Sequence, residues 1–144
     1  MTVAACAVGR LEPEGAWIGF APTIDDGYAL VVGADDRAAA AVPAAPDDLI
    51  ALAIAYFADE LPEPPEALAA THGDIGAIVR HVATLDASQE RRRLLGEAVD
   101  AVDDGLAADV VVGALSRCLT SEEEALALLR RRAAELLARR HAAG

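Results

Sequence analysis

Three residues within one short stretch have side chains suited to acid–base chemistry: His72, Asp74 and His81. Asp74 and His81 are seven positions apart, which places them on one face of a helix, about two turns from each other. A histidine and a carboxylate that share a face can pass a proton to or from a substrate, so these three are the candidate catalytic residues. The competing interpretation is that Thr71 and Asp74 cap a helix with surface histidines.

Three aromatic residues are candidates for lining a ligand pocket: Trp17, Tyr28 and Tyr56. They lie in segments expected to form a sheet and a helix, so a pocket between these two layers would be bordered by them and by the histidines. The alternative is that all three belong to the core, since large aromatic side chains are mostly buried and dominate core packing. Both interpretations stay open at the level of sequence.

Motifs for a metal or a cofactor are missing around these residues. No two of the three histidines are three or four positions apart, so they form no helical pair of ligands. Cys6 and Cys118, the only cysteines, are too few for a zinc site, and we predict that both are buried and reduced. Neither a phosphate-binding glycine loop nor G-x-S-x-G occurs. We therefore expect no metal and no cofactor.

The charge of the chain restricts its partners. The formal net charge is −12, which disfavours binding to nucleic acid and to anionic membranes. All 12 basic residues are arginine, a bias typical of a GC-rich bacterial genome. The first ten residues lack the basic region of a signal peptide, so we predict a cytoplasmic location. These features fit a soluble protein with a protein partner.

The segment Leu49–Phe57 is the expected centre of the fold. It consists of nine consecutive apolar residues, and its alanines favour a helix over a strand. Because a helix that is apolar on all sides must be covered on all sides, we predict a buried helix over residues 47–61. The preceding pair Asp47-Asp48 suits a helix N-terminus, and Pro62 is the expected stop. The run is too short to cross a bilayer, which takes about 20 residues.

The chain before this helix has the pattern of an antiparallel meander. Short apolar runs alternate with turn residues, and Asp26-Gly27 is the best hairpin signal because a tight turn needs positive φ. A further turn is expected at Pro13-Glu14-Gly15. The strands are apolar on both faces, so either the sheet is covered on both sides or one face meets a partner. The four runs are Val3–Leu11, Ala16–Ala21, Tyr28–Gly33 and Arg37–Val42.

The chain after this helix is predicted to be helical. The connector Leu61–Glu66 contains three prolines, which favour an extended conformation. Helical periodicity then begins at Thr71, and Asp86 is the expected cap of the next helix. Three adjacent valines make the segment 108–119 a weaker helix prediction. The last helix, Ser121–His141, begins with an S-x-x-E capping box.

We therefore predict a single α+β domain over residues 1–144, with mostly α as the alternative. Its strand-rich half, 1–61, carries the central helix, and its helical half is 66–144. We expect an acidic interaction or accessory protein, resembling an immunity protein, an antitoxin or a subunit in general character, that binds a protein partner or itself as a homodimer. The alternative is a small-molecule-binding protein or a small enzyme, whose pocket lies between the sheet and the helices near His72 and His81.

Overall fold

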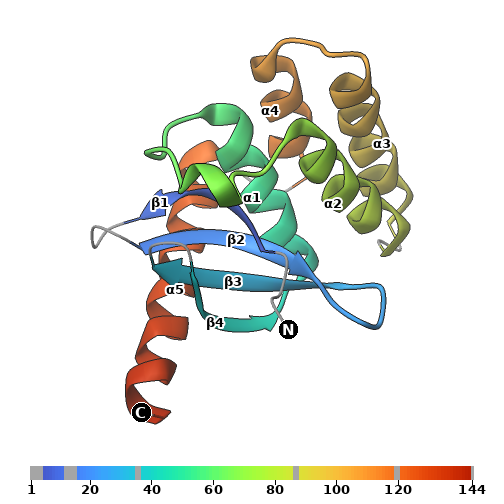
Figure 1. The fold of residues 1–144 in the computed structure, drawn as a ribbon. Coiled ribbons are helices and arrows are strands. Elements are labelled where there is room, and N and C mark those ends of the chain that lie inside the picture. Colours follow the sequence, from blue (N-terminus) through green and yellow to red (C-terminus); the bar gives the residue numbers. More distant parts are fainter. Residues whose placement is uncertain (1–4, 12–15, 35–36, 86–87, 119–120, 144) are drawn as a thin grey trace.

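The computed structural model describes residues 5–11, 16–34, 37–85, 88–118 and 121–143, and it has the expected α+β architecture (Figure 1). An antiparallel sheet is followed by a set of helices. The elements are β1 (Cys6–Leu11), β2 (Ala16–Pro22), β3 (Tyr28–Ala34), β4 (Arg37–Pro43), α1 (Pro46–Ala58), the short 3₁₀ helix η1 (Glu66–Leu68), α2 (His72–Leu85), α3 (Gln89–Asp103), α4 (Ala108–Ser116) and α5 (Glu122–Ala143).

The sheet is the predicted meander, with strand order β1-β2-β3-β4. In the loop between β2 and β3, Asp26 has φ of 63°, so the Asp-Gly signal marks the residue that needs a left-handed conformation. The N–H of Thr23 closes this loop by donating to the carbonyl of Gly27 over 3.0 Å. The expected turn at Pro13-Glu14-Gly15 lies outside the described residues.

Helix α1 lies behind the sheet and is the buried centre of the fold (Figure 1). Every residue from 48 to 55 is buried, because the sheet, α2, α4 and α5 all contact this helix. The helix is shorter than the predicted 47–61. It ends at Ala58 because Asp59 takes a left-handed conformation, with φ of 54°, and its N–H donates to the carbonyl of Ala55. Proline at 62 disfavours the helical conformation at the residue before it, so the turn comes earlier.

The second face of the sheet is covered by the chain's own connector. Trp17 and Val31 are buried there, and Leu68 of η1 packs against them. The connector also runs along the outer edge of β1, where the N–H of Arg10 donates to the Pro62 carbonyl and the N–H of Ala70 donates to the Ala7 carbonyl, each over 2.9 Å. Pairing of this kind protects an edge strand from other chains.

The remaining helices pack around α1 and beyond it. Ser88 caps α3 by accepting a hydrogen bond from the N–H of Arg91, whereas the expected cap Asp86 lies outside the described residues. The segment α4 is helical despite its valines, because Val111 and Leu115 are buried against neighbouring helices. Helix α5 packs on α1 and crosses behind β3 and β4, and it continues past the β4 edge (Figure 1).

Candidate functional site

His72 lies next to Tyr56 at the far end of α1. Its Nδ1 is 2.8 Å from the Tyr56 hydroxyl, a hydrogen-bonding distance. The side chains of Tyr56, Phe57 and His72 form a cluster in which each ring meets the others edge to face, with centroids 4.9–5.5 Å apart. His72 is the first residue of α2 and is exposed, so the fold brings two of the predicted site residues together at the surface.

The side chain of Asp74 acts mainly as part of the helix cap of α2. Its Oδ2 accepts hydrogen bonds from the backbone N–H and the hydroxyl of Thr71, over 2.9 and 3.0 Å. The Cys6 thiol of β1 lies near enough to Asp74 to be influenced by its negative charge. Burial, followed by the charge of Asp74, raises the pKa of the Cys6 thiol. The pair therefore keeps the sulfur protonated and does not activate it as a nucleophile.

His81 lies two turns further along α2 and contacts a different aromatic residue. Its ring meets Tyr28 of β3 edge to face, with centroids 5.0 Å apart, and Tyr28 in turn packs on Phe20. Burial, and after it the charges of Cys6 and Asp74, raises the pKa of Tyr28. Tyr28 therefore contacts His81 directly and is influenced by the charge of Asp74. The two histidines contact different aromatic residues, His81 with Tyr28 and His72 with Tyr56.

Trp17 lies apart from all of these residues. Its side chain is fully buried on the second face of the sheet, and it packs so closely on Gly33 that a Cβ there would lie 2.3 Å from the indole ring. A ligand between the sheet and the helices would be on the opposite face of β2, where Ile18 and Phe20 point. The position of Trp17 favours the core interpretation for this residue.

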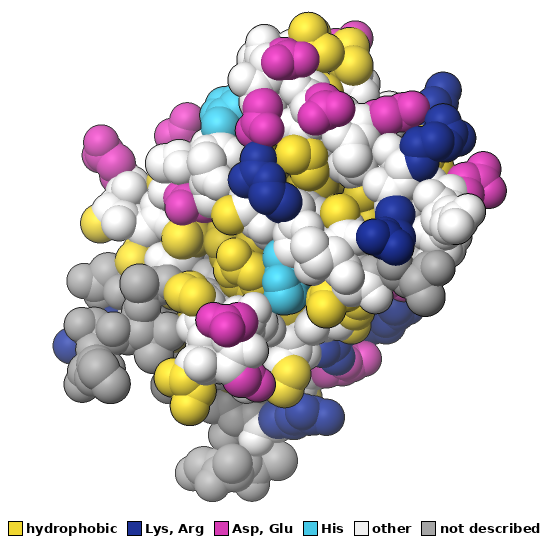
Figure 2. All heavy atoms as spheres, turned by 90° about the vertical axis from the view of Figure 1, so that its right-hand side faces the viewer, with side chains coloured by type: hydrophobic (Ala, Val, Ile, Leu, Met, Phe, Trp, Pro, Cys, Tyr) yellow, Lys and Arg dark blue, Asp and Glu magenta, His cyan; other side chains and the backbone are white. Residues whose placement is uncertain are grey.

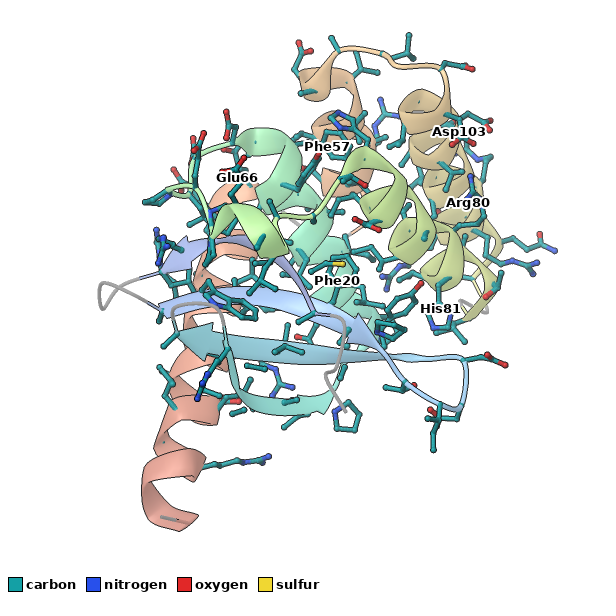
Figure 3. All side chains as sticks on the ribbon, viewed as in Figure 1. Phe20, Phe57, Glu66, Arg80, His81 and Asp103 are labelled. Carbon is teal, nitrogen blue, oxygen red and sulfur yellow. The ribbon has the colours of Figure 1, made fainter. Side chains whose placement is uncertain are left out.

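A cleft of about 350 Å³ lies beside the Tyr56–His72 pair. Sequence reasoning found two of its residues and missed the others, which come from the end of α1 and from the connector. Figure 3 labels Phe57 of this lining and Glu66 of the connector, both in the upper half of the view. The cleft is lined by Ala7, Val8, Tyr56, Phe57, Asp59, Leu61, Glu63, Pro64, Ala69, Ala70, His72 and Ala108. Only the docking of the connector on β1 creates this surface, so no local pattern signals it.

A shallower groove of about 670 Å³ runs between α2 and α3. Its floor includes Ala83, Gly96 and Val99, and arginines stand around it. Figure 2 shows this side of the molecule, where apolar side chains are exposed among arginine and acidic side chains. Arg80 and Asp103 join the two helices at 2.9 Å, and Figure 3 shows both on the outer side of the fold. Both side chains of this pair are more than half exposed, so the pair adds little to stability.

The titratable side chains around Asp74 share one electrostatic feature. The thiol and the two phenols nearest to Asp74 all have a raised pKa, and burial is the largest cause each time, so each is held in its neutral form. Within the described residues, no group of three or more histidine, cysteine or acidic side chains is placed to hold a metal ion. Likewise, no helix in the described part of the chain is long and apolar enough to span a membrane.

Comparisons with known proteins give no further guide to this site: no family model, no curated protein and no solved structure matches the chain.

Proposed function

We propose that this is an interaction or accessory protein that works by binding protein, first of all a second copy of itself. The observation that carries the proposal is the outer edge of β4. In the described residues β4 pairs with β3 only, so its other side presents backbone N–H and C=O groups without a strand beside them. Such an edge is a ready template for another strand. The acidic charge and the cytoplasmic location that the sequence predicts are compatible with this role.

The chemistry of β4 suits close approach by another backbone. Four of its seven residues are alanine, and Arg37 is its one charged residue. The N–H of Ala44 donates to Tyr28 of β3, so by alternation the N–H groups of Val42 and Ala40 face β3, whereas that of Ala41 faces outward. Pro43 falls at an outward position, where its missing N–H costs the intramolecular ladder nothing.

A second copy is the occupant that best matches this edge. When two β4 strands pair antiparallel about a twofold axis at Ala40, Arg37 lies opposite Pro43 of the partner, so no like charges meet. The two sheets then become one continuous sheet. Helix α5 already extends past β4 (Figure 1), where it would lie against the added copy. In such a dimer, both the β4 edge and the part of α5 that extends past β4 would contact the second copy.

The oligomeric state tests this proposal. We expect the wild-type protein to be a dimer by size exclusion with light scattering, and metal chelation should leave it unchanged. Ala41→Pro removes one outward N–H and should yield a folded monomer. Ala40→Pro is the matched control, because it removes an N–H that faces β3 and should reduce the free energy of unfolding. A wild-type monomer at high concentration, or an Ala41→Pro variant that remains a dimer, would contradict the proposal.

The second candidate is a small-molecule-binding protein or a small enzyme, and the cleft beside Tyr56 and His72 is the observation that favours it. Its volume of about 350 Å³ is at the lower end of the usual range for ligand sites. His81 does not line this cleft, so a role for both histidines in one pocket is not supported by the geometry. Loss of biological activity in a His72→Ala variant that still forms the dimer would favour this candidate.

A further inference from the structure

The cleft beside Tyr56 combines aromatic walls with acidic groups. The rings of Tyr56, Phe57 and His72 form one side, and Leu61 and Pro64 add aliphatic surface. The carboxylates in its lining are Asp59 and Glu63, whose residues are exposed at its rim. Among the residues that the structure describes, no lysine or arginine lines the cleft. One cationic side chain, Arg10, lies next to the cleft, and its Nε donates to the backbone carbonyl of Glu63 over 2.9 Å.

The C-terminal end of α1 carries acidic rather than basic side chains, which is the opposite of what helix C-termini usually favour. Helix C-termini favour cations, because their free carbonyl groups carry partial negative charge. The last turn of α1 has no basic residue, and Asp59 and Glu60 follow it directly. Burial, followed by the charges of Asp74 and Asp59, raises the pKa of Tyr56. Negative charge therefore accumulates at this helix end.

We infer that this cleft binds an organic cation, namely an alkylammonium or guanidinium group, carried either by a free amine or by a lysine or arginine side chain of another protein. Asp59 and Glu63 supply opposite charge, and among the described residues neither forms an ion pair. The aromatic rings supply cation–π attraction, and the aliphatic walls contact the carbon chain. A bound cation would also offset the negative end of α1. The site is independent of the β4 edge.

Calorimetric titration of the wild-type protein with n-butylammonium and N-butylguanidinium tests this inference, with 1-butanol as the neutral probe of similar shape. We expect saturable binding of both cations and none of the alcohol. The double substitution Asp59→Asn with Glu63→Gln should weaken cation binding about tenfold, roughly 1.4 kcal/mol. Asparagine is suited to position 59 because it tolerates the left-handed conformation there.

The matched control is the double substitution Glu97→Gln with Asp103→Asn on α3, which removes the same charge on another surface. Its affinity for the cations should equal that of the wild type. If both double variants weaken binding equally, the attraction is only that of a diffuse acidic surface, and the cleft is not a cation site. Equal binding of 1-butanol would also overturn the inference, as would failure of both cations to saturate.

The source of the cation is distinguished by a short peptide with a single lysine and by the same peptide with acetyl-lysine. Tighter binding of the lysine peptide than of butylammonium, lost on acetylation, supports a protein side chain as the ligand. Binding of butylammonium as tight as that of the peptide supports a free amine. Light scattering of the same variants measures the dimer separately. If the cations do not bind but the protein is a dimer, only the cation inference is overturned. If the protein is a monomer but binds the cations, only the β4 proposal is overturned.

Discussion

Arg132 on α5 lies 3.3 Å from the carboxylate of Asp48 at the start of α1, and Asp48 is only 3% exposed. The other Asp48 oxygen accepts the N–H of Ala45 over 2.9 Å, so one buried side chain both caps the central helix and ties it to the last helix. Arg132 also contacts Glu135 of its own helix. This contact therefore holds α1 and α5 in a defined position relative to each other.

Removal of Arg132 should therefore destabilise the fold. Arg132→Ala leaves a buried carboxylate with a backbone partner only, and we expect a loss of about 1–3 kcal/mol, below the range for a fully buried pair because the arginine is partly exposed. Arg93→Ala is the matched control, since its pair with Glu97 is exposed and should contribute less than about 0.5 kcal/mol. Urea denaturation measures both, and equal losses would contradict the assigned role.

The central position of α1 predicts a large effect of truncation within it. Ile54 is fully buried, so Ile54→Ala should cost about 2–5 kcal/mol through lost burial and a residual cavity. Ile24→Ala is the control, because Ile24 in the β2–β3 loop is fully exposed and its loss should change stability by less than about 0.5 kcal/mol. A loss below about 0.5 kcal/mol at Ile54 would show that α1 is not the core.

We expect alanine substitutions at Gly33 and at Gly96 to change the stability of the protein in opposite directions. A Cβ at Gly33 would overlap the indole of Trp17 and the backbone of β4, so Gly33→Ala should cost about 1–3 kcal/mol or more. Gly96 lies within α3 with nothing near its missing Cβ, so Gly96→Ala should stabilise the protein by about 0.5–1 kcal/mol. Thermal unfolding separates the two signs. A harmless Gly33→Ala would contradict the close packing of the Trp17 indole on Gly33.

The cysteines should react slowly with a thiol reagent in the native protein. Cys118 is 7% exposed, as predicted, whereas Cys6 is half-buried and is limited instead by its raised pKa. Because the negative charge of Asp74 contributes to that shift, Asp74→Asn should lower the pKa of Cys6 and speed its labelling at a fixed mildly alkaline pH.

Asp103→Asn, which removes an acid from α3, should leave the labelling rate unchanged. Fast labelling of Cys6 in the wild type would contradict the assignment. So would slower labelling in Asp74→Asn, since the sign of the electrostatic contribution would then be reversed.

The amino-acid sequence by itself determined the class of this fold and most of its element boundaries. Alternating apolar runs with turn residues produced the meander, and the T-x-x-D and S-x-x-E signals marked the starts of α2 and α5, where Thr71 and Ser121 do accept the expected backbone N–H groups. The apolar run Leu49–Phe57 identified the buried helix for a simple reason: local spacing decides which faces must leave water.

Only the tertiary structure decided which distant residues meet. The proline-rich connector lies on β1, and this docking covers Trp17 and places Glu63 beside the cleft that Tyr56 and His72 line. Local patterns carry no information on such contacts, since they depend on how already formed elements fit together and which backbone edges remain unpaired. The same holds for the open side of β4, which is an edge only because no other segment of the described chain pairs with it.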